Sequence, residues 1–165
     1  TEAFKIAREA GVCTVLNPAP AREMPAEYYQ LADYLTPNET EAEFFTGCYQ
    51  ADFEPELWRR RVSECFREKG VRNLIVTLGA QGALYAGEQG SCRVPPYKVD
   101  AVDTTAAGDA FNAAFCIRLA AGASVWEAVR YANAAGAMTA AEYGSLPSMP
   151  KKEALELFIR RMEEQ

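Results

Sequence analysis

One stretch of the chain combines residue types that could bind an anion and accept a proton. Residues 102–115 read VDTTAAGDAFNAAF, in which Gly108 and Asp109 precede a run of small and aromatic residues that favours a helix. Gly108 lets a ligand approach the backbone closely, and the first N–H groups of a helix have no partners and attract phosphate. A carboxylate at this place would repel phosphate, unless a reaction occurs there or a cation lies between the two.

The same stretch also has a purely structural interpretation. Asp is common in the first turn of a helix because it complements the helix dipole, and Thr104 or Thr105 suits the N-cap position. A ligand site requires residues from several elements that lie close together. The positions of other motifs in the chain therefore distinguish the two interpretations.

The amino-acid composition limits the kinds of partner that the chain could bind. The 165 residues are enough for one domain with a substantial core, and 49% apolar and 24% charged residues are ordinary for a globular protein. A net charge of −6 argues against nucleic acid as a partner, because phosphate backbones require a basic face. No apolar run approaches membrane-spanning length, so no membrane partner is expected.

The cysteine and histidine content narrows the chemistry. The five cysteines are widely spread and form no C-x-x-C pair, which argues against a disulfide or zinc framework and favours a reducing cytoplasm. There is no histidine, so a general base must be Asp, Glu, Lys, Tyr or Cys.

The periodicity of apolar residues predicts strands that alternate with helices. This order indicates an α/β fold of three α/β/α layers with a largely parallel central sheet. The run Arg59-Arg60-Arg61 is typical of a solvated helix face. The expected strands are 12–16, 34–36, 71–77, 83–86, 91–94 and 97–102, and the expected helices are 1–10, 28–32, 41–45, 55–69, 105–119, 124–141 and one that begins at Pro150.

In such folds ligands bind beyond the carboxyl ends of the strands. Three candidate motifs occupy that position: Asn38 after the second strand, residues 77–79 after the third, and residues 106–109 after the last. Because all three motifs follow strands in this way, a functional site is favoured over a purely structural helix start at residues 106–109.

Four motifs in this order and spacing closely resemble the ribokinase (PfkB) family of sugar kinases. They are LNPAPA (16–21), TPNETEAE (36–43), VTLGAQGAL (76–84) and VDTTAAGDAFNAAF (102–115). The resemblance covers essentially all of the chain but corresponds only to the C-terminal half, or slightly more, of a family member. It implies a ribokinase-like fold that is incomplete at its N-terminal side, with residues 1–165 as a single nucleotide-binding domain.

The resemblance implies that Asp109 is the catalytic base and contacts the sugar hydroxyl. The N–H groups of Ala106, Ala107 and Gly108 would then form the anion hole for the transferring phosphoryl group. Without the resemblance, residues 77–82 suit a hairpin turn and Asn133 is a polar residue in an Ala-rich helix. The implied ATP-binding residues are Asn38, Thr77, Leu78, Gly79, Ala80, Gln81, Gly82, Gly108 and Asn133.

Two metal ions are implied as well. Glu41 would act on Mg²⁺ through water, although Asn38 and Glu41 also have the spacing of a helix capping box. Residues 144–147 alone read as a helix stop. The ligands implied for K⁺ are Asp103, Thr105, Thr139, Glu142, Gly144 and Ser148.

The implied activity is ATP-dependent phosphorylation of a sugar primary hydroxyl, most closely of D-ribose to D-ribose 5-phosphate. Alternatives are a sibling kinase for deoxyribose, fructose, ketodeoxygluconate or a nucleoside, or a non-catalytic nucleotide-binding fragment. The family's sugar-binding and lid segments lie in an N-terminal half that is absent here. We therefore expect a cytoplasmic chain that is inactive alone and that belongs to a homodimer when full length.

Overall fold

The computed structural model describes residues 1–164, which form two compact units. The first unit contains residues 1–78 and 84–93, and the second contains residues 79–83 and those from 94 onward. Among residues 1–164, no helix is long and apolar enough to cross a membrane.

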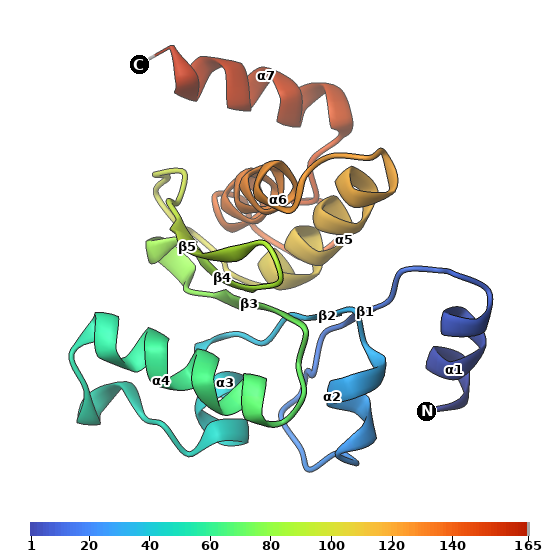
Figure 1. Ribbon diagram of the computed structural model, residues 1–165. Helices are drawn as coiled ribbons and strands as arrows, with labels where there is room; N and C mark the ends of the chain where they lie inside the picture. The colour runs from blue at the N-terminus through green and yellow to red at the C-terminus, as the bar shows by residue number, and fades with distance from the viewer. Residues whose placement is uncertain (165) are drawn as a thin grey trace. The chain divides into compact units, whose positions relative to one another are not determined.

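A five-stranded sheet dominates the first unit, in the order β1-β2-β3-β4-β5 (Figure 1). The first three strands pair in parallel, with Val15 opposite Tyr34 and Tyr34 opposite Asn73. Short turns connect the later strands, so the sheet is mixed rather than purely parallel. The strands are β1 (Val15–Leu16), β2 (Tyr34–Leu35), β3 (Asn73–Thr77), β4 (Ala83–Gly87) and β5 (Gly90–Val94).

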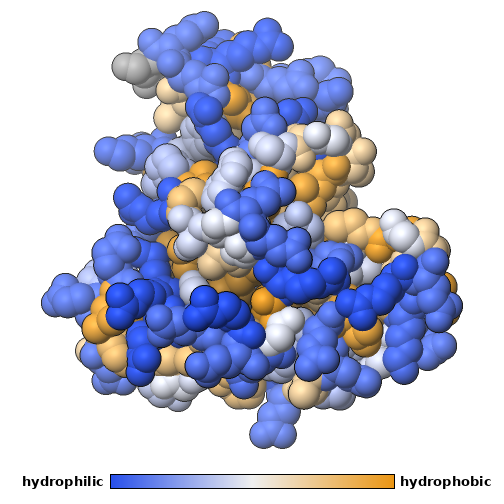
Figure 2. Space-filling model, in the orientation of Figure 1, coloured by the Kyte–Doolittle hydropathy of each residue, from blue (hydrophilic) through white to orange (hydrophobic). Residues whose placement is uncertain are grey.

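Helices α2, α3 and α4 of the first unit contribute buried apolar residues to its core, whereas α1 has no buried residue. On α4, Trp58, Val62 and Phe66 recur at helical spacing and join Leu74 and Val76 of β3 in one cluster. Figure 2 shows mainly hydrophilic side chains on the visible face over α3 and α4. The helical elements are α1 (Glu2–Glu9), α2 (Glu27–Leu31), α3 (Glu39–Thr46), the 3₁₀ turn η1 (Gln50–Asp52) and α4 (Pro55–Glu68).

The second unit is helical. It contains the 3₁₀ turn η2 (Gly79–Gln81), α5 (Ala107–Ala120), α6 (Val125–Ala140) and α7 (Lys152–Glu163). The Ser124 hydroxyl accepts from the N–H of Glu127, and the Glu127 carboxylate accepts from the N–H of Ser124, so a capping box begins α6.

Two expectations from the sequence were wrong. Residues 97–102 form no strand, because Pro95 and Pro96 lack N–H donors and the N–H of Val102 donates instead to the carbonyl of Ala140, at 2.7 Å. Arg59 does not belong to a solvated face, since it is only 8% exposed and forms an ion pair with Glu56. An arginine can be buried in this way when a carboxylate partners it.

Candidate functional site

The N-terminus of α5 has an unusual backbone. Ala106, its N-cap, lies in the left-handed region at φ 63° and ψ 3°, and it is the only non-glycine residue among residues 1–164 with positive φ. This conformation is unfavourable for any residue with a Cβ. A left-handed residue beside helical ones turns successive N–H groups toward one point, an arrangement that binds anions.

The N–H groups at this place are not all equivalent. The N–H of Ala107 donates to the carbonyl of Thr104 at 3.2 Å, whereas within residues 1–164 the N–H groups of Ala106 and Gly108 have no backbone acceptor. A Cβ added to Gly108 would meet nothing within 4 Å, so the protein itself does not require glycine there. Asp109 follows in the first turn of α5 and is exposed. The start of α5 therefore combines open space at Gly108, N–H groups without a backbone acceptor and the exposed carboxylate of Asp109.

Helix α6 packs against α5 close to this first turn. A Cβ on Gly136 would lie 3.2 Å from the carbonyl oxygen of Ala107, closer than most side chains come. Glycine at this position therefore lets α6 approach the start of α5.

Asp103 connects two loops of the second unit. One carboxylate oxygen accepts the N–H of Thr105 at 2.9 Å, and the other accepts the N–H of Gly144 at 3.0 Å. Hydrogen bonds from the Thr105 hydroxyl, the Thr105 N–H and the Gly144 N–H hold the pKa of Asp103 below its ordinary value. Asp103 is therefore a fixed negative charge between the two loops.

The remaining residues implied for a cation gather around these loops. The Ser148 hydroxyl is buried and donates to the carbonyls of Gly144 and Ser145. The hydroxyl oxygen of Thr139 is fully buried and has no hydrogen-bond partner among residues 1–164. A buried oxygen without a partner is suited to bind a cation. The N–H of Glu142 donates to the carbonyl of Thr139 at 3.3 Å. Carbonyl, hydroxyl and carboxylate oxygens are the donors that a hard cation prefers, so this set fits K⁺.

In the first unit, two predicted residues meet at the carboxyl ends of neighbouring strands. Asn38 and Thr77 form a parallel bridge, and the N–H of Thr77 donates to the carbonyl of Pro37 at 3.0 Å. Asn38 is exposed and Thr77 is half-buried. The structure therefore brings these two residues together, as the order of the elements predicted.

The capping box at α3 is present. The Asn38 side-chain oxygen accepts the N–H of Glu41, and a Glu41 carboxylate oxygen accepts the N–H of Asn38, both at 2.8 Å. Glu41 is only 6% exposed. The amide nitrogen of Asn38 is not used by the cap, so it is the atom of this pair that can serve a ligand.

The segment 78–82 divides into structural and exposed residues. The side chain of Leu78 is buried in the apolar cluster of the first unit. Gly82 has φ 90°, and a Cβ there would lie 2.2 Å from the carbonyl oxygen of Val94, so its own packing requires glycine. Ala80 and Gln81 are exposed with Gly79. The structure thus explains Gly82 as a turn residue and leaves residues 79–81 open to a ligand.

Asn133 has a structural role in α6. It is 8% exposed, and its amide nitrogen donates to the carbonyls of Val94 and Pro95 at 3.3 and 3.0 Å. The amide holds the chain after β5 against α6, so the structural alternative accounts for this residue.

Sequence reasoning missed one residue at the sheet edge. Asn17 directly follows β1, as Asn38 and Thr77 stand at the ends of β2 and β3. Its side chain donates to the carbonyl of Thr36 at 2.8 Å. The signal was available in the motif LNPAPA, because an Asn after a buried strand occupies the same position as Asn38.

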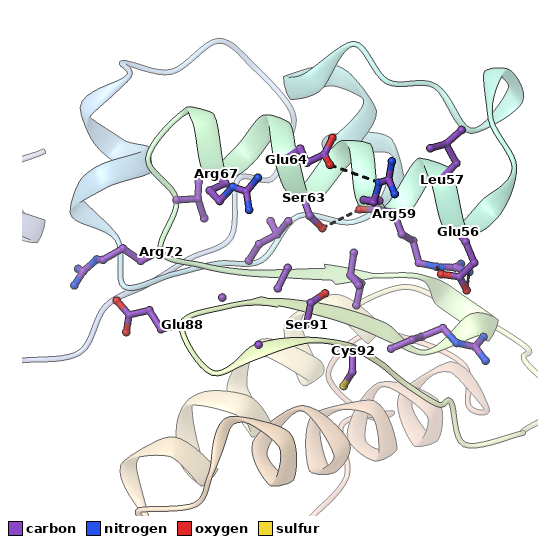
Figure 3. A pocket seen from close by; sticks show the side chains of 18 residues that line it. Glu56, Leu57, Arg59, Ser63, Glu64, Arg67, Arg72, Glu88, Ser91 and Cys92 are labelled. Carbon is purple, nitrogen blue, oxygen red and sulfur yellow. Dashed lines mark hydrogen bonds and ion pairs between the residues drawn. The ribbon is translucent and has the colours of Figure 1, made fainter.

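The first unit also has a groove of about 1050 Å³ between α4 and strands β3–β5 (Figure 3). Arginine, glutamate and serine side chains line it, and several of the charges pair with one another, as Arg60 does with Glu64. None of the predicted site residues belongs to its lining. The groove is therefore separate from the residues that the sequence singled out.

Comparison with known proteins gives consistent relatives. The family model "pfkB family carbohydrate kinase" matches residues 1–152. A ribokinase of Haemophilus influenzae is 40% identical over 155 residues, which cover 93% of this chain and 50% of the relative. The chain thus spans about half the length of this relative.

Solved structures agree with this result. The crystal structure of a Thermotoga maritima ribokinase has a TM-score of 0.84 and 37% identity, covering 96% of this chain and 52% of that one. The structure of Arabidopsis thaliana ribokinase complexed with ribose and ATP has a TM-score of 0.87 and 30% identity, covering 96% and 51%. The α/β fold predicted from the sequence is confirmed as ribokinase-like, and the chain belongs to the pfkB family of carbohydrate kinases.

Proposed function

We propose that this chain forms the nucleotide side of a sugar kinase that transfers the γ-phosphoryl group of ATP to a primary hydroxyl, with D-ribose as the substrate. The observation that carries the proposal is the start of α5, where left-handed Ala106 and open Gly108 precede exposed Asp109. Free N–H groups and a carboxylate at one helix terminus suit phosphoryl transfer to a hydroxyl.

Asp109 accepts the proton of the sugar hydroxyl as that oxygen attacks phosphorus. A carboxylate suffices because phosphoryl transfer depends more on positioning and charge stabilisation than on a strong base. The N–H groups of Ala106, Ala107 and Gly108 form the anion hole. Since Ala107 already donates to Thr104, Ala106 and Gly108 supply its freest donors.

The ATP contacts are proposed by resemblance to the family. The exposed amide of Asn38, the backbone of residues 77–81 and the N–H of Gly108 are the proposed contacts. Asn133 remains in the proposed set only by resemblance, because its amide nitrogen is engaged within the protein.

Two metal ions belong to the proposal. Buried Glu41 would act through water on magnesium, which would supply charge neutralisation at the ATP phosphates. The unpartnered Thr139 hydroxyl and the Asp103 carboxylate would hold potassium beside the anion hole. Thr105, Glu142, Gly144 and Ser148 complete that proposed ligand set.

The sugar side of the site is assigned to a partner segment, the N-terminal half that the family implies. The chain alone is accordingly proposed to bind ATP without phosphorylating sugar, and a homodimer held by the N-terminal lid is part of the same proposal. Two relatives called ribokinase favour ribose, and the second candidate is a sibling kinase for deoxyribose, fructose, ketodeoxygluconate or a nucleoside.

The test uses the chain alone and a hybrid in which the chain replaces the matching half of the Haemophilus influenzae ribokinase. Calorimetry of the chain with Mg-ATP, in potassium and in sodium buffer, should show saturable binding that is stronger in potassium. ADP release by the hybrid should be fastest with D-ribose in a panel with deoxyribose, fructose and adenosine. ATP binding without turnover in any hybrid would instead favour the non-catalytic nucleotide-binding fragment.

A further inference from the structure

Two cysteines that are distant in the sequence are in contact in the first unit. The Sγ atoms of Cys48 and Cys65 lie 3.8 Å apart, although 17 residues separate them in the chain. Cys48 follows α3, and Cys65 lies on α4. Both are half-buried, whereas Cys13, Cys92 and Cys116 are exposed. A sulfur–sulfur contact at this distance needs only a small movement to reach bonding distance.

Hydrogen bonds from both helices fix the position of Cys48. The indole N–H of buried Trp58, on α4, donates to the Cys48 carbonyl at 2.9 Å. The N–H of Cys48 donates to the Thr46 hydroxyl at 3.2 Å, and that hydroxyl donates to the carbonyl of Ala42 at 2.7 Å. The two thiols are therefore in contact because these hydrogen bonds hold the backbone of Cys48 beside α4.

We propose that Cys48 and Cys65 are a redox-responsive pair, which closes to a reversible intramolecular disulfide when a small-molecule disulfide such as oxidised glutathione is present. This inference goes beyond the proposed kinase function and does not depend on it. The linkage joins the end of α3 to α4.

The reaction is a thiol–disulfide exchange in two steps. The thiolate of one cysteine of the pair attacks one sulfur of oxidised glutathione, and the first glutathione leaves as a thiol. The other cysteine then loses its proton and attacks the protein sulfur of the mixed disulfide, so the second glutathione leaves. Two protein thiols are oxidised, and one glutathione disulfide is reduced to two thiols.

Burial, together with the contact with Cys48, raises the pKa of the Cys65 thiol. Because the thiolate is the attacking species, this raised pKa lowers the reactivity of Cys65.

The disulfide should stabilise the first unit without blocking the proposed ATP site. Cys48 lies beyond the C-terminal end of α3, whereas Asn38 caps the opposite end of that helix. A cross-link between residues 48 and 65 reduces the freedom of the unfolded chain. The melting temperature of the oxidised chain should therefore rise by about 5 °C.

The experiment equilibrates the chain with graded ratios of reduced and oxidised glutathione, blocks free thiols and maps disulfides by mass spectrometry. The expected product is a peptide pair linked through Cys48 and Cys65, with the loss of two hydrogens, which dithiothreitol reverses. This product should exceed any cross-link that involves Cys92 or Cys116 by roughly tenfold or more, because the contact raises the effective thiol concentration.

Cys48→Ser and Cys65→Ser should each abolish the linked peptide and the melting shift, and Cys92→Ser, at an exposed position, should preserve both. The linked peptide in the unchanged chain is informative even if a serine variant folds poorly. The proposal is overturned if Cys48 and Cys65 stay reduced in oxidised glutathione while Cys92 becomes glutathionylated. Equal cross-linking of all five cysteines would overturn it as well.

Discussion

The backbone of Ala106 links the folding of α5 to its proposed chemistry. A left-handed conformation costs a residue with a Cβ about 1–2 kcal/mol, and glycine would avoid that cost. Such strain persists at ligand-binding loops when the surrounding structure imposes it. Gly136 lets α6 approach the carbonyl of Ala107, the residue that follows Ala106.

Ala106→Gly should therefore raise the free energy of unfolding by up to about 1 kcal/mol, as urea denaturation would measure. The matched control is Ala113→Gly on the same helix, at an exposed position with ordinary helical geometry. That control should lower the free energy of unfolding by about 0.5–1 kcal/mol. Equal destabilisation by both substitutions would show that Ala106 is not strained.

Asn38 has two separable roles, a helix cap through its oxygen and a proposed ATP contact through its nitrogen. Asn38→Ser keeps a good cap, so the free energy of unfolding should change little, while the affinity for ATP should fall by roughly tenfold. Asn38→Ala loses the cap as well and should cost about 1 kcal/mol of stability. Calorimetry and urea denaturation measure the two effects; unchanged ATP affinity in Asn38→Ser would leave Asn38 as a cap only.

Single residues also show where sequence reasoning reaches its limit. The capping boxes were predictable, because both partners lie within one helical turn. The partners of Asn133 and Gly82 were not predictable, because they are backbone atoms of Val94 and Pro95, which are distant in the sequence. A polar residue or a glycine in a motif has the same appearance whether a ligand or the protein itself requires it.

At the scale of elements, Asp103 joins the loop before α5 to the loop after α6. Its folded-state pKa lies below the unfolded value of about 3.9. The ionised carboxylate therefore stabilises the folded chain above about pH 4, and this contribution disappears as the pH falls through the lowered pKa.

Asp103→Asn should remove this part of the pH dependence. The melting temperature of the variant, measured from about pH 2.5 to 6, should fall less steeply on acidification than that of the unchanged chain. Asp100→Asn, at an exposed position nearby, is the matched control and should keep the original slope. Identical slopes in all three proteins would mean that Asp103 does not stabilise the folded state as a carboxylate.

Elements with a strong pattern were predicted well and weakly patterned ones were not. Helix α4 has Pro55 at its first position and an apolar stripe, and β3 contains the buried apolar run 74–76, so both were recognisable. The segment 97–102 contains strand-forming residues but no strand, because pairing depends on a partner edge that composition does not reveal. The groove beside α4 and the cysteine contact likewise arise only when distant segments fold together.

At the scale of the whole molecule, the proposed site residues are divided between two units. The first unit carries Asn38 and Thr77 at the carboxyl ends of parallel strands, and the second carries the start of α5 and the Asp103 loops. The Arabidopsis thaliana ribokinase complexed with ribose and ATP shares this fold over 51% of its own chain. The kinase proposal accordingly requires Asp109 to act on a sugar that another segment holds.

The most direct measurement is kcat for ribose phosphorylation by the hybrid with the Haemophilus influenzae half, with and without Asp109→Asn. Loss of the base should lower kcat by about 10²–10⁴-fold, while the dissociation constant for ATP stays similar because the anion hole and Asn38 are intact. Asp100→Asn should leave both values unchanged. A hybrid whose Asp109→Asn variant phosphorylates ribose at nearly the unchanged rate would contradict the assignment of Asp109 as the base.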